Sequence, residues 1–353
     1  MTSVVRLADR VPLELPGAGA LTPLLADPTV TDVLVNGRHV WVDRGAGLVR
    51  AAVPVGAPED VRRLAQRLAA AAGRRLDEGC PFADARLPDG TRLHAVLPPI
   101  AVNGPYLSLR RFRARAFTLG ELVAAGTVSG AGAKLLAAIV AARLAYLVTG
   151  GTGAGKTTVL STLLGLVPHD ERIVLVEDAA ELRPAHPHVV ALQARTSNVE
   201  GAGEVGLRSL VRQALRMRPD RLVIGECRGA EVIDLLGALN TGHEGGAGTL
   251  HANAPQDVPA RLEALGLLGG IPREALHAQV AAALQVVVHL RRTESRDRVV
   301  DQVCLLLPDA GRRLVSAVPA WHRADGPGRA ATALAQLLAR RNVPVPDALG
   351  ARP

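Results

Sequence analysis

The stretch GGTGAGKTT, from Gly150 to Thr158, determines how the rest of this sequence is interpreted. The apolar residues 144–148 before it predict a short buried strand, and residues 158–164 after it predict the start of a helix. Backbone N–H groups and a helix N-terminus can then converge on one anion, so this order favours a phosphate-binding loop over a simple turn. It fits the pattern G-x-x-x-x-G-K-[ST], whose fixed positions here are Gly150, Gly155, Lys156 and Thr157.

The loop predicts that the protein binds a nucleoside triphosphate. Lys156 is expected to reach the β- and γ-phosphates, and the Thr157 hydroxyl is expected to coordinate Mg²⁺. The chain contains only two lysines, Lys134 and Lys156, and every other basic residue except histidine is arginine. A lysine inside the loop fits this function, because a compact ammonium enters between phosphates where a planar guanidinium does not. The candidate phosphate ligands are Gly150, Gly151, Thr152, Gly153, Ala154, Gly155, Lys156, Thr157 and Thr158.

Length and composition indicate two domains. A chain of 353 residues is long enough for two cores, and 48% apolar residues with few aromatics predict cores of Leu, Val and Ala. No apolar run approaches the roughly 18 residues of a membrane helix, and the N-terminus has no signal-peptide core, so a cytoplasmic location is expected.

Cys80, Cys227 and Cys304 are widely spaced and odd in number, which suits reduced thiols.

The net charge of +8 is modest for this length. Arginines cluster at residues 110–115, 74–75 and 340–341, where they could face acidic lipid headgroups, a nucleic acid or an acidic partner. For any single cluster, an ordinary solvated surface is the favoured interpretation. Aromatic residues do not interleave with the arginines as they do on base-stacking surfaces, so a nucleic-acid partner is not the first expectation.

Residues 1–112 predict a small α+β domain. Asn36-Gly37 is expected to turn a hairpin over residues 32–44, and Asp89-Gly90 a second hairpin over residues 86–98. A helix is expected from residue 58, and a further strand at residues 106–112. The pattern then breaks over residues 113–132, which contain four glycines and are interpreted as a linker and hinge.

Residues 133–353 predict an α/β domain with a parallel sheet. The apolar runs 172–178 and 221–226 each end in a carboxylate, and ligands of open α/β sheets bind at the carboxyl ends of the strands. These acids are therefore expected beside the phosphate-binding loop. The remaining predicted elements are strands at 286–291, 298–307 and 312–318 and a helix at 329–340.

Two acidic segments supply candidate catalytic groups. Glu226 suits a contact to Mg²⁺ or to water, and the segment EDAAEL supplies Glu177, Asp178 and Glu181, one of which could polarise the attacking water. The alternative for each acid is that it caps the helix that follows.

His243 and His251 flank the glycine-rich segment TGHEGGAGTLHAN. A metal site is disfavoured, because no third His or Cys lies at ligand spacing. Sensing of the γ-phosphate and a structural role both stay open for each histidine.

Four segments, in this order and spacing, resemble one family. GGTGAGKTT, VEDAAEL, LRMRPDRLVIGECRG and TGHEGGAGTLHAN are similar to the Walker A loop, Asp box, Walker B segment and His box of the type II and type IV secretion ATPases. Within this family, the sequence resembles the CpaF/TadA branch most, whose members power tight-adherence (Flp) pili. VTDVLVNGRHVWVDR and RLPDGTRLHAVLPP also resemble the N-terminal domain of that branch.

The resemblance implies a RecA-like P-loop NTPase domain preceded by a smaller PAS-like α+β domain. It implies a homo-hexamer that hydrolyses ATP with Mg²⁺ and is peripherally associated with the inner membrane through a polytopic platform protein. Glu226 matches the Walker B acid, Glu181 the catalytic base with Glu177 as its alternative, and His243 and His251 the His box. Arg92 and Arg110 match N-terminal-domain arginines that reach the phosphates.

Three functions compete at this point. The first is a motor ATPase whose domain motion drives pilus assembly or protein secretion, with pilin-like or secreted cargo engaged indirectly. The second is a conjugation-associated ATPase that handles DNA or a DNA–protein cargo. The third, a nucleotide-dependent scaffold without hydrolysis, is disfavoured by the full set of acids.

Overall fold

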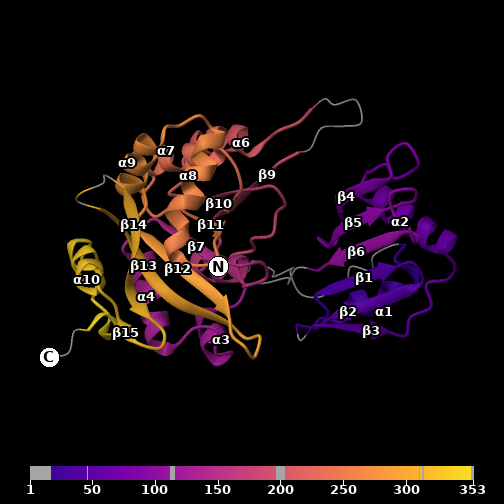
Figure 1. Ribbon diagram of the computed structural model, residues 1–353, viewed down its shortest axis with the longest axis horizontal. Coiled ribbons are helices and arrows are strands. Elements are labelled where there is room, and N and C mark those ends of the chain that lie inside the picture. Colours follow the sequence, from indigo (N-terminus) through magenta and orange to yellow (C-terminus); the bar gives the residue numbers. More distant parts are fainter. Residues whose placement is uncertain are drawn as a thin grey trace, which may run out of the picture. The chain divides into compact units, whose positions relative to one another are not determined.

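A computed structural model describes residues 17–45, 47–111, 116–195, 203–309, 311 and 314–350 (Figure 1). The chain divides into two compact units, Met1–Ala114 and Arg115–Pro353, and each has its own apolar core. The ends of the predicted strands 106–112 and 312–318, and most of the arginine cluster 110–115, lie outside the described residues.

The first unit is an antiparallel sheet with a helix on one face. Alternate strand residues point into the core, where they meet Val61, Leu64, Ala65, Leu68 and Ala69 of helix α2 (Pro58–Ala71). The period of 2 in the strands and the helical spacing in α2 explain why these segments pair and pack as they do. In sheet order the strands are β3 (Leu48–Ala51), β2 (His39–Asp43), β1 (Asp32–Asn36), β6 (Tyr106–Arg110), β5 (Arg92–Val96) and β4 (Phe82–Arg86); a short helix α1 (Thr22–Ala26) precedes them.

Both predicted hairpins of this unit are confirmed, and one turn is displaced. The β4–β5 hairpin turns at Asp89-Gly90, where Gly90 has φ +89°. In the β1–β2 hairpin Asn36 pairs with His39, so the turn residues are Gly37 and Arg38 rather than Asn36-Gly37. Gly37 supplies the positive φ of +59°, while Asn36 continues the strand because its backbone pairs on both sides.

The segment interpreted as a glycine-rich linker is mostly ordered within the second unit. Thr118 and Glu121 form a capping box that begins helix α3 (Leu119–Ala124). Leu122 and Val128 are almost fully buried in the core of the second unit, and Ser129 caps helix α4 (Gly130–Ala141). Residues 118–132 of this segment therefore belong to the packed structure of the second unit.

The second unit is a nine-stranded mixed sheet between two helical layers (Figure 1). Helices α4, α5 (Lys156–Leu164) and α10 (Ala331–Arg340) share one core, and α6 (Leu207–Leu215), α7 (Glu231–Asn240), α8 (Val258–Leu268) and α9 (Arg273–Ala283) share the other. In sheet order the strands are β15 (Gly326–Pro327), β14 (Val315–His322), β13 (Arg298–Pro308), β12 (Val286–Arg292), β7 (Tyr146–Gly150), β11 (Ala247–His251), β10 (Arg221–Cys227), β8 (Ile173–Glu177) and β9 (Val189–Gln193).

Strand direction divides this sheet. The strands from β12 to β9 are parallel, whereas β13, β14 and β15 pair antiparallel at one edge. The central parallel strands β7 and β8 are buried on both faces and therefore read as continuous apolar runs, such as residues 173–176. The strands and helix predicted beyond residue 285 are confirmed as β12, β13, β14 and α10.

A buried ionic network lies at the amino-terminal end of the parallel strands. The Arg221 side chain is 1% exposed and donates to the Glu171 carboxylate at 2.5 Å and to the carbonyls of Val140 and Gly245 at 3.3 Å. Arg143 also contacts Glu171, at 2.8 Å. A buried charge costs free energy unless it is paired and hydrogen-bonded, and this network supplies both.

Gly245→Ala should destabilise the second unit strongly. Gly245 has φ +74°, and an added methyl group would lie 2.1 Å from Nη1 of Arg221. Backbone strain and displacement of the buried guanidinium together should lower the free energy of unfolding by about 3 kcal/mol. The matched control is Gly242→Ala, because Gly242 has φ +98° with no atom within 4 Å of the added methyl group. Equal denaturation midpoints for the two variants would contradict this account.

None of the helices in the described part of the chain combines the length and the apolarity that crossing a lipid bilayer requires.

Candidate active site

The sheet order places most of the predicted site residues of the second unit together, at the carboxyl ends of its central strands. Strands β7, β11, β10 and β8 are consecutive neighbours and run parallel. Their carboxyl ends carry Gly150, His251, Glu226 and Glu177 respectively. His251 pairs directly with Gly150 in the β11–β7 register. Segments that are separated by up to a hundred residues therefore meet where ligands of open α/β sheets bind.

The phosphate-binding loop depends on glycines where the backbone leaves the usual regions. Gly153 has φ +68°, and Gly155, which precedes helix α5, has φ +97°. A methyl group on Gly150 would lie 2.5 Å from the carbonyl oxygen of Leu290 on β12. Any side chain at these positions would be strained or would collide with backbone, which accounts for the glycine spacing of the motif.

Lys156 occupies the interior of the loop and is 8% exposed. Its ammonium donates to the carbonyls of Gly150 and Gly151, each at 3.1 Å, and lies 3.3 Å from both ring nitrogens of His251. Burial lowers the pKa of the ammonium, Arg228 lowers it further, and Glu226 and Glu181 oppose this change. The ammonium is thus held where an anionic ligand in the loop would meet it.

Glu226 connects the loop to His251. Its carboxylate lies 2.7 Å from Nε2 of His251 and also forms an ion pair with Arg228. The β10–β11 register shifts between Ile224 and Cys227, and such a bulge turns a side chain away from its regular direction. Burial lowers the pKa of His251 and Lys156 lowers it further, so a neutral imidazole is favoured at neutral pH.

The two candidate bases of the Asp box differ in environment. Glu177 is 3% exposed, and its Oε1 accepts the backbone N–H groups of Glu181 and Leu182 at 2.9 and 3.0 Å. A methyl group on Gly225 would lie 2.6 Å from Cγ of Glu177, so that glycine makes room for this side chain. Glu177 therefore holds the loop that follows β8 in place.

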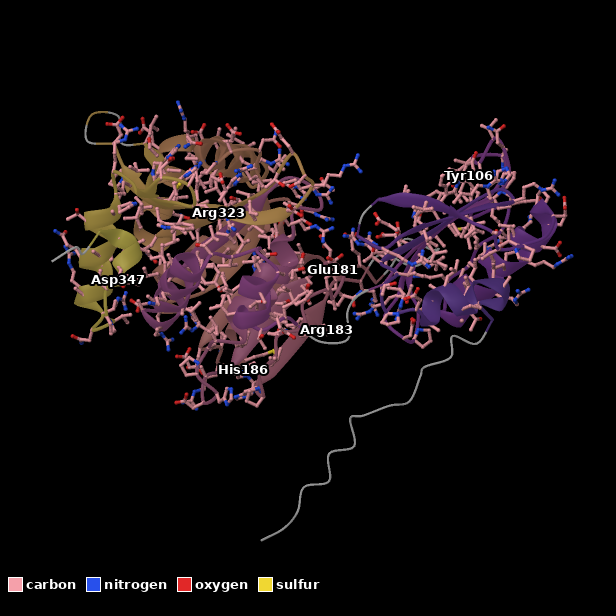
Figure 2. The ribbon with its side chains drawn as sticks, turned by 90° about the horizontal axis from the view of Figure 1, so that it is seen from below. Tyr106, Glu181, Arg183, His186, Arg323 and Asp347 are labelled. Carbon is pink, nitrogen blue, oxygen red and sulfur yellow. The ribbon has the colours of Figure 1, made fainter. Side chains whose placement is uncertain are left out.

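Glu181 lies on the loop that Glu177 organises (Figure 2). It is half-buried, and its charge acts on the pKa values of Lys156 and Arg228. Of the two acids, Glu181 is therefore the one with access to solvent, and its charge raises the pKa values of Lys156 and Arg228.

The structure does not bring His243 to this cluster. His243 precedes β11, whereas His251 ends it, and the four strand steps from Ala247 to His251 span roughly 13 Å at about 3.3 Å per residue. The His243 ring lies 3.2 Å from the carbonyl of Ala238, in the last turn of α7. The parallel direction of β11 and β7 places His243 at the edge of the sheet opposite the loop.

Arg92 and Arg110 lie side by side on adjacent strands of the first unit. They are direct cross-strand partners, and each is partly exposed. Arg92 lies 3.8 Å from Asp84, and Arg110 lies 4.0 Å from Asp32. The two like charges are therefore opposite each other, and each has a carboxylate within 4.0 Å.

Sequence reasoning missed four residues around the loop. Arg228 pairs with Glu226, and its position two residues after the Walker B acid was the available signal. The buried His289 lies 2.9 Å from Oγ1 of Thr149, and Arg292 contacts the carbonyl of Gly153. Arg298 packs beside Gly155. The last three come from β12 and β13, whose segments carry no motif.

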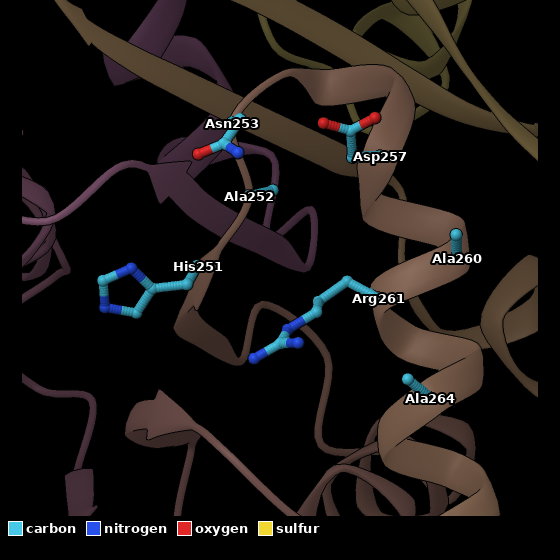
Figure 3. Close-up of a pocket in the computed structure, with 7 residues that line it drawn as sticks. All are labelled: His251, Ala252, Asn253, Asp257, Ala260, Arg261 and Ala264. Atoms are coloured by element: carbon cyan, nitrogen blue, oxygen red, sulfur yellow. The ribbon is translucent and has the colours of Figure 1, made fainter.

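An open pocket lies beside His251, between the end of β11 and helix α8 (Figure 3). The side chain of Arg261 extends from α8 toward the side on which His251, the last residue of β11, lies, and its charge also lowers the pKa of His251. The pocket is lined by His251, Ala252, Asn253, Asp257, Ala260, Arg261 and Ala264.

Oxygen donors for a metal ion lie at this edge. Within the described ranges, no three His, Cys, Asp or Glu side chains converge on a common point. His243 and His251, the two histidines of the glycine-rich segment, lie apart. Thr157, in the first turn of α5, and Glu226 offer hydroxyl and carboxylate oxygens, which are the donors that Mg²⁺ prefers.

Comparison with known proteins gives one family model and several relatives. The model described as "Type II/IV secretion system protein" matches residues 14–324. A Mycobacterium tuberculosis protein, provisionally named for conjugal transfer, is 57% identical over 335 residues, which are 93% of this chain and 95% of the relative. The conjugal transfer protein TrbB of Rhizobium radiobacter is 31% identical over 78% of this chain and 83% of its own. The type IV secretion system protein PtlH of Bordetella pertussis is 32% identical over 80% of this chain and 92% of its own.

Solved structures show the same fold. The ATPase DotB of Yersinia pseudotuberculosis has a TM-score of 0.59 at 17% identity, over 84% of this chain and 80% of DotB. The pilus retraction motor PilT with bound ADP has a TM-score of 0.57 at 21% identity, over 80% of this chain and 81% of PilT. The predicted fold class, a RecA-like α/β domain preceded by a smaller α+β domain, is confirmed.

Proposed function

The chain belongs to the type II/IV secretion system protein family, and from that premise we propose that it is an ATP hydrolase that powers secretion. The observation that carries the proposal is the position of Lys156. A buried ammonium that contacts two loop carbonyls and a histidine is poised to exchange those contacts for phosphate oxygens. The first test is whether the purified protein releases phosphate from ATP.

ATP is the proposed substrate, and residues 150–158 are its proposed phosphate ligands. The positive-φ glycines of the loop and the N-terminus of α5 support this, because together they present backbone N–H groups to one anion. The Thr157 hydroxyl, and Glu226 through water, would hold Mg²⁺. The metal would neutralise charge on the transferred phosphoryl group when it is bound.

Glu181 is the proposed base that orients and deprotonates the attacking water. Its partial exposure and its electrostatic contact with Lys156 support this assignment over Glu177, whose carboxylate binds backbone N–H groups. A neutral His251 beside Lys156 and Glu226 would accept or donate a hydrogen bond near the γ-phosphate. No role at the phosphates is proposed for His243.

Arg92 and Arg110 are proposed to supply additional cations to the bound triphosphate. Their cross-strand pairing and partial exposure support this, because two adjacent guanidinium groups can both donate hydrogen bonds to one polyphosphate anion. ATP would then draw the first unit toward the second, and hydrolysis would release it. A hinge between Arg110 and Thr118 would absorb that motion.

The double variant Arg92→Ala, Arg110→Ala should lower kcat/KM for ATP by about 10² or more, because two charge-assisted contacts to the phosphates would be lost. Steady-state hydrolysis measures the effect. The control is Arg62→Ala, Arg63→Ala, which removes the same charge from helix α2, where both arginines are ion-paired at the surface. Full activity in the first double variant would remove both arginines from the site.

The proposed assembly is a homo-hexamer bound in the cytoplasm to a polytopic inner-membrane platform, as in the CpaF/TadA branch. In this form the protein would drive pilus assembly or protein secretion by domain motion. The family model supports a secretion role, and the PilT fold likeness is compatible with a motor. Mass measurement of the ATP-bound protein tests the oligomeric state.

A conjugation-associated ATPase is the second candidate, and the names of two relatives favour it. Conjugal transfer appears in the name of the relative that is 57% identical and in that of TrbB. A strain that lacks the protein distinguishes the two roles. Loss of surface pili or of secreted protein supports the first, and loss of DNA transfer to a recipient supports the second. Complementation with the Lys156→Ala variant should fail for whichever process is affected.

A further inference from the structure

The hairpin formed by β12 and β13 runs alongside the phosphate-binding loop (Figure 1). Strand β12 pairs in parallel with β7, with Leu290 opposite Gly150, where β7 ends and the loop begins. Two further residues, Arg291 and Arg292, continue β12 past that point. The hairpin therefore contacts the loop from the side opposite the His251–Glu226 cluster, since β7 lies between β12 and β11.

Arg292 holds one carbonyl of the loop. Its Nε and Nη2 donate to the carbonyl oxygen of Gly153 at 3.3 and 3.2 Å. A methyl group on Gly153 would lie 2.9 Å from Nη2, so the absence of a side chain permits this approach. Arg298, the cross-strand partner of Arg292, packs beside Gly155 in the same way, 3.6 Å from where a methyl group would be.

The consequence of this contact follows from peptide geometry. In a trans peptide the C=O and the next N–H point in opposite directions. When Arg292 draws the Gly153 carbonyl outward, the N–H of Ala154 must face the interior of the loop. It does so here, where it donates to the carbonyl of Gly151 at 3.3 Å. The Lys156 ammonium donates to that same carbonyl at 3.1 Å.

We propose that Arg292 is a positioning residue that orients the Gly153–Ala154 peptide for phosphate binding. With a nucleoside diphosphate or triphosphate in the loop, the Ala154 N–H and the Lys156 ammonium exchange the Gly151 carbonyl for phosphate oxygens. Arg292 keeps the peptide in place during this exchange and acts from outside the loop. This inference rests on the proposed nucleotide-binding function.

The contact also accounts for a feature that sheet pairing leaves unexplained. Arg292 and Arg298 are directly opposite each other, and like charges in that arrangement destabilise an antiparallel pair. A leucine or threonine at position 292 would pair better but would leave the Gly153 carbonyl without its two donors. The guanidinium fork matches this role, because it presents two parallel N–H groups to one oxygen.

The test measures binding of a fluorescent ADP and displacement of it by inorganic pyrophosphate. Arg292→Gln should lower the affinity for ADP and the affinity for pyrophosphate by about tenfold each. The reason is that the Ala154 N–H is no longer preorganised as a hydrogen-bond donor to the phosphates. Pyrophosphate has no base or ribose, so equal losses assign the effect to the phosphate cradle. Arg296→Gln is the matched control, since it removes the same charge from the turn of the same hairpin. It should remain within about twofold of the unmodified protein.

Three results would overturn the inference. The first is that Arg292→Gln binds both ligands like Arg296→Gln and the unmodified protein, the second is that it loses affinity for ADP alone, and the third is that it loses affinity for pyrophosphate alone. Arg292→Lys, which keeps the charge but offers a compact donor, should recover part of the affinity, and it serves as the test variant if Arg292→Gln does not fold. If the unmodified protein binds neither ADP nor pyrophosphate, it is the proposed function that fails.

Discussion

Lys156→Ala should abolish ATP hydrolysis in a protein that still folds. Lys156 is the only lysine in the loop. Its ammonium donates hydrogen bonds to the Gly150 and Gly151 carbonyls from the interior of the loop. Loss of a cation aimed at the developing charge commonly lowers turnover by about 10²–10³, and loss of phosphate binding adds to this. Phosphate release at saturating ATP measures the effect. Lys156→Arg should also impair turnover severely, because a planar guanidinium does not fit the same space.

The chain offers a matched control for this variant. Lys134 is the other lysine of the protein; it lies on helix α4, and its sequence segment is not part of the phosphate-binding motif. Lys134→Ala removes the same group and should leave hydrolysis close to normal. Near-normal hydrolysis by folded Lys156→Ala protein would refute the assignment of the loop.

Glu181→Gln should separate nucleotide binding from chemistry. Glutamine keeps the shape of the side chain but is not basic, so affinity for ATP should persist while turnover falls by about 10² or more. Binding of a fluorescent ATP analogue and single-turnover hydrolysis give the two quantities. The Lys156 ammonium should keep its position, because its hydrogen bonds are to carbonyls of the loop.

Glu177→Gln is the informative counterpart. Its Oε1 accepts two backbone N–H groups, and an amide oxygen can still accept both. Activity should therefore fall much less than in Glu181→Gln. If Glu177→Gln stops turnover with affinity intact while Glu181→Gln stays active, the two roles are reversed. Asp178→Asn, in the same loop, controls for the loss of one negative charge.

Much of the fold follows from local sequence. Gly90 in the β4–β5 turn, the apolar face of α2 and the apolar run of β8 are each explained by conformational freedom or periodicity within a few residues. The strand–loop–helix order around Lys156 is likewise explained by residues within a short segment. Errors occurred where local signals were ambiguous. Glycines suggested a linker at residues 113–132, but the capping box of α3 and burial of Leu122 show packed structure.

By itself the sequence determined the strand, glycine loop and helix around Lys156, the strand-end acids Glu177 and Glu226, and the two-unit organisation that the hairpins and α/β pattern predict. These depend on backbone preferences and on the rule that parallel strands present their carboxyl ends together. The tertiary structure alone decided which strands are neighbours. The order β12-β7-β11-β10-β8 brings His251 to Lys156 and sends His243 to the other edge. It also brings Arg292 to Gly153, 139 residues away in sequence. Such contacts arise from how the apolar faces of strands and helices pack, and no pattern within a short segment encodes that packing.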